Sequence, residues 1–323
     1  MSLLPDPSEL EAAAAVVYRS VQPTPQYAWP LLAQRLGTEV WVKHENHLPV
    51  GAFKLRGGLV YFAALRRREP ELRGVIAATR GNHGQSVAYA AGLHGFSATI
   101  VVPHGNSREK NAAMRMLGAE LIENGEDFQA AVEHAARLAQ ERGLHRVPSF
   151  HRDLVRGVAT LWLELFRAVS ELDVVLVPIG LGSNICAAAA ARAASGARAR
   201  IVGVVSDQAT AYAQSFAARR LIESPVSTRL ADGLACRTPD AAALSIIWEV
   251  VDDIVQVSEA EVAAAMRAYF SDTHNVAEGA AAAALSGALK IADCLRGKRV
   301  GLPLTGGNVD RELFADVLSQ PGG

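Results

Sequence analysis

The sequence predicts an α/β protein made of two doubly wound domains. From Glu39 onward, short apolar segments typical of strands buried on both faces alternate with longer helical segments. The alternation restarts after Gly143, which is consistent with a second domain. A chain of 323 residues, half of them hydrophobic, is also long enough to bury two cores.

Local signals delimit the elements of the first half. The predicted helices cover residues 8–18, 29–36, 59–65, 85–92, 108–117 and 127–142, and the predicted strands cover 39–46, 74–79, 97–103 and 119–122. Gly118 ends one helix, because glycine readily adopts the left-handed backbone found just past a helix C-terminus. Asp127 can cap the next helix, since its side chain can accept a hydrogen bond from the first turn.

The second half repeats the pattern. The predicted helices cover residues 153–169, an alanine-rich segment after 184, 210–220, a segment after 258, 277–290 and 310–318, and the predicted strands cover 173–178, 200–205, 254–257 and 299–304. Ser258 and Glu261 have the spacing of a capping box. Residues 221–240 are predicted to be irregular.

Composition excludes several classes of protein. The net charge of −1 indicates neither a nucleic acid nor an anionic membrane as a partner. The sequence shows no signal-peptide pattern and no apolar run long enough to span a bilayer. Cys186, Cys236 and Cys294 are widely separated, which favours neither a disulfide framework nor a zinc site. We therefore expect a cytoplasmic protein with buried, unreactive thiols.

Lys54 is the centre of the candidate site. It lies in the segment 51–58, between a predicted strand and a predicted helix, with glycines close by. The positive end of the helix dipole disfavours a cation in the first turn. A deprotonated or covalently engaged amine is therefore one interpretation, and an ordinary solvated lysine is the other.

Three strand-to-helix turns, at residues 79–85, 180–184 and 304–308, carry glycines and polar side chains. In open α/β sheets, ligands bind at such turns. The first offers backbone N–H groups to a carboxylate, and the second offers them to a phosphate. Each turn alone could be capped and without function. Together with Lys54 they supply what pyridoxal phosphate needs: an imine-forming amine, a phosphate anchor and partners for the ring.

Four motifs resemble those of the fold type II pyridoxal phosphate enzymes, specifically the threonine dehydratase and serine racemase family. Residues 52–58 resemble the signature Ser-Phe-Lys-x-Arg-Gly-Ala, and residues 81–85 match Gly-Asn-His-x-Gln. Residues 180–184 occupy the position of the family's glycine-rich phosphate loop, and residues 305–308 occupy the position of its Ser-Gly-Gly-Asn motif. The resemblance implies a tryptophan synthase β-like fold with the cofactor in the cleft between two domains. We expect a large domain (1–46 and 146–323), a small domain (47–145) and a homodimer.

The resemblance also implies roles for single residues. Lys54 is expected to be the Schiff-base lysine, Asn82 to bond the ring's phenolate oxygen and Thr305 to face the pyridine nitrogen. The expected cofactor-binding residues are Phe53, Lys54, Asn82, Gly180, Leu181, Gly182, Ser183, Asn184, Glu278 and Thr305. The expected substrate-binding residues are Thr79, Arg80, Gly81, Asn82 and His83.

The sequence departs from the family pattern at informative positions. Arg80 stands where serine racemases carry a serine used as a second acid/base. Arginine stays protonated and transfers protons poorly, which disfavours racemisation. It could instead contact an anionic or polar group of the substrate, or be a structural arginine. Val205 and Ala211 replace the acids of metal-binding members, so we expect no divalent metal.

The implied activity is that of a dehydratase, an ammonia-lyase that removes water from a β-hydroxy amino acid and yields a 2-oxo acid and ammonia. A racemase or β-replacement synthase of the same fold is one alternative, and a non-enzymatic ligand-binding α/β protein is another. Residues 27–32 and 148–157 resemble a catabolic branch that includes dehydratases of hydroxyectoine utilisation. The substrate side chain stays open among threonine, serine, 3-hydroxyaspartate, phenylserine and a hydroxyectoine breakdown product.

Overall fold

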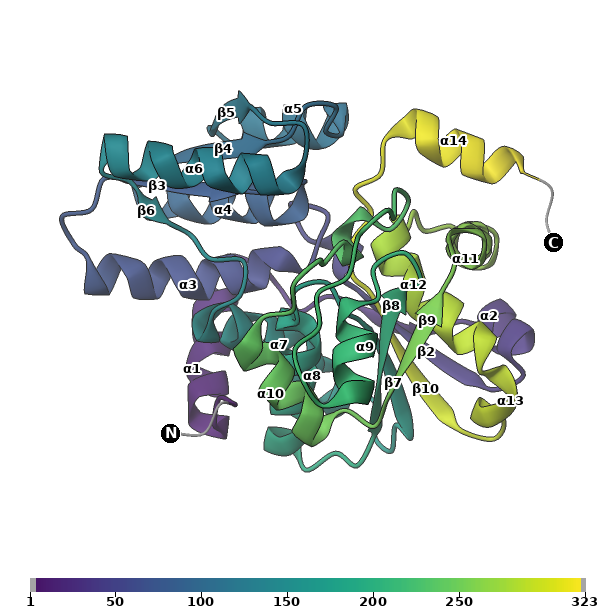
Figure 1. Cartoon of the computed structure of the whole chain (residues 1–323). Coiled ribbons are helices and arrows are strands. Elements are labelled where there is room, and N and C mark those ends of the chain that lie inside the picture. Colours follow the sequence, from purple (N-terminus) through teal and green to yellow (C-terminus); the bar gives the residue numbers. More distant parts are fainter. Residues whose placement is uncertain (1–3, 321–323) are drawn as a thin grey trace.

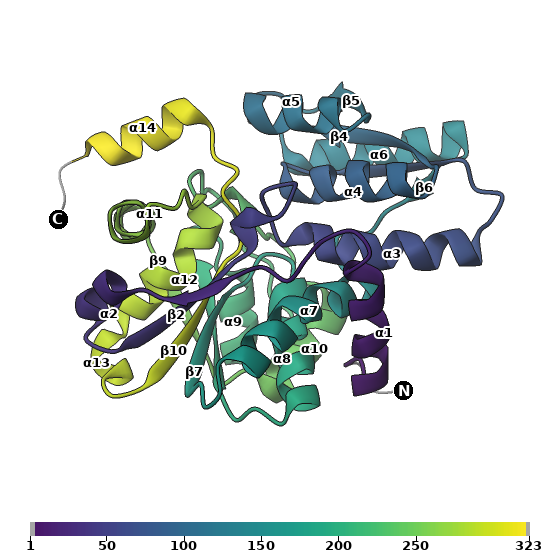
Figure 2. The same cartoon turned by 180° about the vertical axis from the view of Figure 1, so that it is seen from behind.

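Two β-sheets, one of six strands and one of four, each lie between layers of helices (Figure 1). The computed structural model describes residues 4–320. We call the six-stranded sheet with its helices the large lobe, and the four-stranded sheet with helices α3 to α6 the small lobe. The first and last helices lie on opposite sides of the molecule, as the view from behind also shows (Figure 2).

The sheet of the large lobe has the order β1-β2-β10-β7-β8-β9. Its strands are β1 (Gln26–Ala28), β2 (Glu39–His44), β10 (Arg299–Leu304), β7 (Val174–Pro178), β8 (Arg200–Ser206) and β9 (Asp253–Val257). All neighbours are parallel except β1, which runs antiparallel to β2. Strand β7 is buried at every position, which explains its unbroken apolar sequence in the middle of a sheet covered on both faces.

Helices cover both faces of this sheet. One face carries α1 (Pro7–Val17), α7 (Arg152–Ala168), α8 (Ser183–Ser195), α9 (Ala211–Ala218) and α10 (Ala241–Val250). The other carries α2 (Pro30–Leu36), α11 (Glu259–Thr273), α12 (Gly279–Lys290), α13 (Ala292–Leu295) and α14 (Arg311–Ser319). Alanine dominates the buried faces of α8 and α12, and these small side chains let both helices lie close to the sheet.

The sheet of the small lobe is parallel and has the order β5-β4-β3-β6. Its strands are β3 (Gly74–Ala78), β4 (Ser97–Val102), β5 (Glu120–Glu123) and β6 (His145–Arg146). One face packs on α3 (Lys54–Arg68), α4 (Asn82–Leu93) and α5 (Arg108–Met116), and the other packs on α6 (Phe128–Arg142).

The lobes are joined where α3 crosses α7. A Cβ atom on Gly157 of α7 would lie only 2.1 Å from the backbone oxygen of Arg56, so this crossing requires glycine. The Arg56 side chain is fully buried and bonds two carboxylates, Glu45 at 2.7 Å and Glu164 at 2.6 Å. Lys43 also contacts Glu164, at 2.5 Å, and completes a buried cluster of two cations and two anions. This cluster fixes α3 two residues after Lys54.

The α/β fold class predicted from the sequence is confirmed. The caps predicted at Asp127 and Ser258 are present, the second as a full capping box with Glu261. Among residues 4–320, two strands, two α-helices and two short 3-10 helices were not predicted: β1, β6, α10, α13, and η1 (Glu45–His47) and η2 (Asp232–Leu234). The domain limits stay a prediction, and the limit at 145/146 falls within β6.

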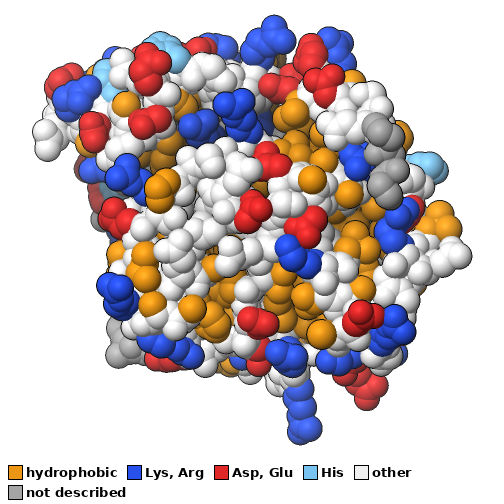
Figure 3. Space-filling view, turned by 45° about the vertical axis from the view of Figure 1, so that its right-hand side comes forward, with side chains coloured by type: hydrophobic (Ala, Val, Ile, Leu, Met, Phe, Trp, Pro, Cys, Tyr) orange, Lys and Arg blue, Asp and Glu red, His pale blue; other side chains and the backbone are white. Residues whose placement is uncertain are grey.

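The face shown in Figure 3 carries no strong excess of one charge, as expected from the net charge of −1. Side chains of both signs are interspersed on the face in Figure 3. Among residues 4–320, no helix is both long and apolar enough to cross a membrane.

Candidate active site

A cavity of about 720 Å³ opens where the lobes meet, at the carboxyl ends of their strands. The turns that follow β3, β7 and β10 all contribute to its wall. Every residue predicted for the site lines it: Phe53, Lys54, Thr79, Arg80, Gly81, Asn82, His83, Gly180, Leu181, Gly182, Ser183, Asn184, Glu278 and Thr305. The fold therefore brings together four motifs that are far apart in the chain.

Lys54 is the first residue of α3 and is half-buried. Two hydrogen bonds fix the backbone at Lys54 and at the residue before it. The Phe53 N–H donates to the Thr305 carbonyl at 2.9 Å, and the Ser86 hydroxyl donates to the Lys54 carbonyl at 2.7 Å. Burial lowers the pKa of Lys54 from 10.5 to about 8, against the opposing effect of the Glu278 carboxylate. Near neutral pH a far larger share of this amine is uncharged than in an ordinary lysine, so it can act as nucleophile or base.

The turn after β3 leads into α4 without a side-chain cap, so the N–H groups of the first turn are free for a carboxylate. The Thr79 hydroxyl accepts a hydrogen bond from the Gly81 N–H at 3.0 Å. Glycine is needed at position 81, because a Cβ atom there would lie 2.4 Å from the Lys110 side chain. Burial lowers the pKa of His83 to about 3, so its ring is neutral. Its buried Nε2 atom has no partner among residues 4–320.

The turn after β7 leads into α8, again without a side-chain cap. Gly182 has φ of +94°, and a Cβ atom there would lie 2.6 Å from Ala243. The Asn184 carbonyl oxygen accepts a hydrogen bond from the Trp162 ring at 2.9 Å, while its buried amide nitrogen has no partner in the described chain. Free N–H groups at the start of a 13-residue helix, beside an unpaired amide, suit a phosphate.

Glu278 and Thr305 close the site from the large lobe. The Asn82 amide donates to Glu278 at 2.5 Å, and the Asn308 amide donates to the Asn82 oxygen at 2.8 Å. These bonds orient the Asn82 amide and leave it a second hydrogen for a ligand. Burial raises the pKa of Glu278 from 4.5 to about 7, although the Lys110 ammonium opposes this shift. Thr305 is buried directly after β10.

Lys110 and Asp232 belong to this site but were not predicted. The Lys110 ammonium lies 2.9 Å from Asp232 and 3.7 Å from Glu278. It therefore joins α5 of the small lobe to the large lobe at the cavity wall. Asp232 lies within the segment 221–240, which was predicted only to be irregular. No local signal pairs residues 122 positions apart.

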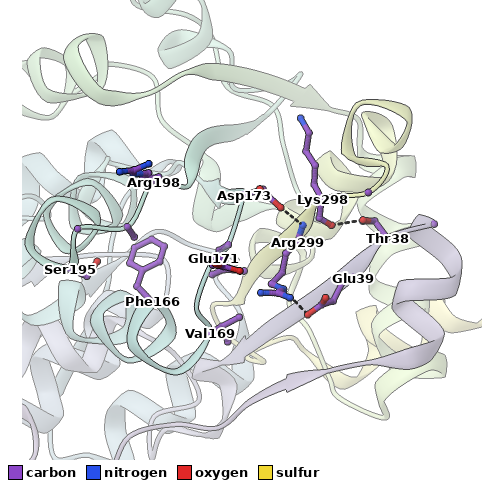
Figure 4. Close-up of a pocket in the computed structure, with 15 residues that line it drawn as sticks. Thr38, Glu39, Phe166, Val169, Glu171, Asp173, Ser195, Arg198, Lys298 and Arg299 are labelled. Atoms are coloured by element: carbon purple, nitrogen blue, oxygen red, sulfur yellow. Dashed lines mark hydrogen bonds and ion pairs between the residues drawn. The ribbon is translucent and has the colours of Figure 1, made fainter.

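A second cavity of about 1010 Å³ lies at the opposite, amino-terminal edge of the large sheet (Figure 4). Several of its polar groups bond one another: Arg299 contacts Glu39 at 2.9 Å, and the Arg299 N–H donates to Asp173 at 2.7 Å. It has none of the predicted motifs, and ligands of open α/β sheets bind at the other edge. We therefore place the candidate site in the cavity between the lobes.

The donor set of that cavity fits pyridoxal phosphate. Lys54 offers an amine with a lowered pKa, and the start of α8 offers unpaired N–H groups and the unpaired amide of Asn184 for a phosphate. Asn82 and Thr305 offer groups for the ring oxygen and nitrogen. The fold and the site thus define a two-lobed α/β enzyme that binds an anionic carbonyl cofactor between its lobes.

The comparisons with known proteins give the family. Residues 17–306 match the family described as pyridoxal-phosphate dependent enzyme. The chain is 35% identical over 291 residues to an L-threonine ammonia-lyase of Geobacter sulfurreducens, covering 89% of this chain and 72% of that one. It is 32% identical over 318 residues to an L-threo-3-hydroxyaspartate ammonia-lyase of Saccharomyces cerevisiae, covering 98% and 97%. The solved structure of maize serine racemase is 27% identical, with a TM-score of 0.89 over 96% of each chain.

The chain belongs to the family of pyridoxal-phosphate dependent enzymes. The predicted family, the fold type II architecture and the cofactor are confirmed, and the named relatives support an enzyme of this class. The roles of the single residues and the absence of a divalent metal stay predictions. Within residues 4–320, no group of three or more His, Cys, Asp or Glu side chains could hold a metal ion.

Proposed function

We propose that this chain is an ammonia-lyase that removes water from a β-hydroxy amino acid and releases a 2-oxo acid and ammonia. The observation that carries the proposal is the meeting of the Lys54 amine with the uncapped starts of α4 and α8 in one cavity. The relatives named L-threonine ammonia-lyase and L-threo-3-hydroxyaspartate ammonia-lyase support it.

Lys54 would hold pyridoxal phosphate through its amine, the residues 180–184 would bind the phosphate, and Asn82, Glu278 and Thr305 would face the ring. The bound cofactor supplies an electron sink that stabilises negative charge at the α-carbon of an amino acid. The first turn of α4 would hold the substrate carboxylate, because its N–H groups are free and the helix dipole favours an anion.

With a substrate bound in the cavity, the Lys54 amine would be the group that takes the α-proton. The lowered pKa makes this amine an effective base near neutral pH. The neutral His83 ring adds no second charge beside it. The β-hydroxyl and the α-proton would leave as one water, and hydrolysis of the C–N bond would consume one water. Threonine would therefore give 2-oxobutanoate and ammonia with no net change in water.

Two residues favour elimination over racemisation. Arg80 stands where serine racemases carry a serine, and a guanidinium is a poor proton shuttle. Thr305 offers a neutral hydroxyl rather than a carboxylate to the ring nitrogen, which leaves the electron sink weak and favours rapid loss of the hydroxyl.

The test is a panel of β-hydroxy amino acids, with 2-oxo acid and ammonia measured for the wild-type protein and for Lys54→Ala. We expect release of both products in a one-to-one ratio and its loss in the variant. Chiral analysis of residual serine and trapping with sulfide check the racemase and β-replacement alternatives. Full activity of Lys54→Ala, or serine racemisation faster than elimination, would refute the proposal.

We also propose that the enzyme is a cytoplasmic homodimer. All three cysteines are unpaired, which fits a reducing compartment. Cys186 and Cys236 are buried as expected, whereas the expectation of a buried thiol is wrong for Cys294, which is exposed. Exposed hydrophobic side chains on β1, α2, α11 and α14 would be covered by a second copy; they are Tyr27, Leu31, Phe270 and Leu313. Sedimentation analysis at micromolar concentration would give a monomer mass if the dimer proposal is wrong.

A further inference from the structure

We propose that Arg80 selects substrates that carry a carboxylate on the β-carbon, so that the preferred class is that of 3-hydroxyaspartate. The inference rests on the proposed ammonia-lyase function and adds the substrate class to it. It follows from the unpaired charge of one side chain in the cavity wall.

Arg80 lies in the turn between β3 and α4, lines the cavity and is half-buried. Its guanidinium has no hydrogen bond and no ion pair to any group within residues 4–320, whereas the buried and half-buried arginines of α3, Arg56 and Arg66, bond two or more acceptors each. A guanidinium that loses part of its water without gaining an acceptor raises the free energy of the site. An anionic ligand would supply the missing acceptor.

Apart from Lys54, the other charged side chains of the cavity wall either have hydrogen-bond or ion-pair partners or are exposed. The Lys110 ammonium is bonded to Asp232 and lies close to Glu278. The Asp127 side chain is exposed and caps α6 by accepting a hydrogen bond from the Ala130 N–H at 2.8 Å. Of the remaining charged residues of the wall, Glu223 and Arg237 are exposed. Arg80 is therefore the guanidinium placed to meet a ligand inside the cavity.

The position of Arg80 also decides which group of the substrate it meets. The α-carboxylate, common to all amino acids, suits the free N–H groups at the start of α4, two residues further on. Arg80 lines the same cavity, so a second carboxylate on the β-carbon of a substrate held there is the group left for its guanidinium. Its planar fork can bind that carboxylate with two parallel hydrogen bonds, which the side chains of threonine and serine cannot accept.

For 3-hydroxyaspartate the chemistry balances. The α-proton and the β-hydroxyl leave as water, the C–N bond is hydrolysed with uptake of one water, and the products are oxaloacetate and ammonia. The β-carboxylate takes no part in the bond changes. Its binding therefore acts on selectivity alone.

The kinetic test compares kcat/KM for L-threo-3-hydroxyaspartate, L-threonine and L-serine. We expect the wild-type enzyme to prefer hydroxyaspartate by about tenfold or more, as for a site built to pair with a polar group that the competitor lacks. Arg80→Gln should reverse this preference, with a fall of about 100-fold for hydroxyaspartate and a much smaller change for threonine. Arg80→Lys should retain part of the preference, because it keeps the charge and loses the fork.

A binding test does not depend on turnover. L-aspartate and L-asparagine have nearly the same shape, and neither carries a β-hydroxyl to eliminate. Calorimetric titration of the wild-type holoenzyme should give a dissociation constant about tenfold or more lower for aspartate than for asparagine. Arg80→Gln should remove the difference, and Arg237→Gln, the exposed arginine of the same wall, should keep it.

The outcomes separate the two proposals. Turnover of threonine or serine with no preference for hydroxyaspartate would overturn the role of Arg80 and leave the ammonia-lyase standing. No turnover of any substrate, with tight Arg80-dependent binding of aspartate, would overturn the ammonia-lyase and keep the role of Arg80. Equal losses for all substrates in Arg80→Gln would assign the guanidinium to the shared α-carboxylate and overturn the inference. Thermal unfolding of the variants checks that each is folded.

Discussion

Lys54 is the residue whose chemistry depends most on its surroundings, and its titration can be measured without substrate. Burial lowers its pKa from 10.5 to about 8, and the Glu278 carboxylate limits the shift by favouring the ammonium form. In the protein freed of cofactor, reductive methylation of Lys54, followed by peptide mass spectrometry, should reach half its maximal rate near pH 8. Glu278→Gln should move this midpoint to lower pH, because the stabilising charge is lost. A midpoint close to 10.5 in both proteins would show that the amine is not desolvated.

Glu278 gives a second prediction at the level of one residue, concerning stability. Its pKa is raised from 4.5 to about 7, so between these values the native carboxyl keeps a proton that the unfolded chain has lost. Its contribution to stability is therefore complete below pH 4.5 and is lost as the pH rises through about 7. Glu278→Gln does not titrate, so its stability relative to wild type should rise over this range, by up to about 3 kcal/mol.

Thermal unfolding of the two cofactor-free proteins from about pH 4 to about pH 8 measures this effect. The difference in Tm between Glu278→Gln and wild type should grow with pH and then level off. A difference that stays constant over the range would mean that Glu278 is ionised throughout.

At the residue scale, sequence reasoning found the side chains that lie in motifs and missed those that do not. Lys54, Asn82 and the turn 180–184 carry local patterns whose chemistry is recognisable without a structure. Lys110 and Asp232 have no such pattern, because each is defined by a partner that folding brings from a distant segment. From the helix dipole, a deprotonated Lys54 was one of two interpretations of the sequence, whereas in the structure burial is the main cause of its lowered pKa.

At the element scale, the crossing of α3 and α7 controls the position of Lys54. Gly157→Ala would place a methyl group against the backbone of Arg56, where no flexible side chain can yield. We expect a loss of stability of about 1–3 kcal/mol or more, as for overpacked cores. Thermal unfolding of the cofactor-free protein measures it, and the affinity for pyridoxal phosphate should fall as α3 shifts.

Gly92→Ala is the matched control for this prediction. Gly92 lies in α4, and a Cβ atom there would meet nothing within 4 Å. Alanine at such a helical position should stabilise the protein by about 0.5–1 kcal/mol. Destabilisation of similar size in both variants would show that the crossing of α3 and α7 has no special demand for glycine.

Element prediction succeeded where periodicity and caps agreed and failed where they did not. Helix α10 was not predicted because it follows an irregular segment and its apolar residues do not form a clear stripe. Its cap, Asp240, accepts hydrogen bonds from two N–H groups of the first turn. The strands β1 and β6 have three and two residues, too few for a period of two to show. Both are edge strands, whose pairing depends on the neighbour rather than on their own sequence.

At the scale of the whole molecule, the two lobes are held together differently on the two sides of the cavity. On one side, α3 and α7 pack closely around the buried cluster of Arg56, Glu45, Glu164 and Lys43. On the other, α5 reaches the large lobe through polar contacts, Lys110 with Asp232 and Ser107 with Asp310. The first connection removes apolar and charged surface from water and is costly to open, whereas the second depends on a few polar pairs.

Lys110→Met should therefore release the polar side alone. Removing the cation breaks the ion pair that joins α5 to Asp232 and leaves that carboxylate without its cation, so α5 should separate more easily from the large lobe. We expect hydrogen exchange in α5 and in the segment 221–240 to speed up by about 10- to 100-fold, a local opening made about 1–3 kcal/mol easier. Exchange in α3 and α7 should stay unchanged.

The control variant is Arg115→Met. It removes another cation of α5, one that pairs with Glu123 within the small lobe, and should leave hydrogen exchange in all four segments unchanged. If Lys110→Met accelerates exchange in α3 and α7 equally, the lobes open as one cooperative unit and the ion pair is not a separate connection.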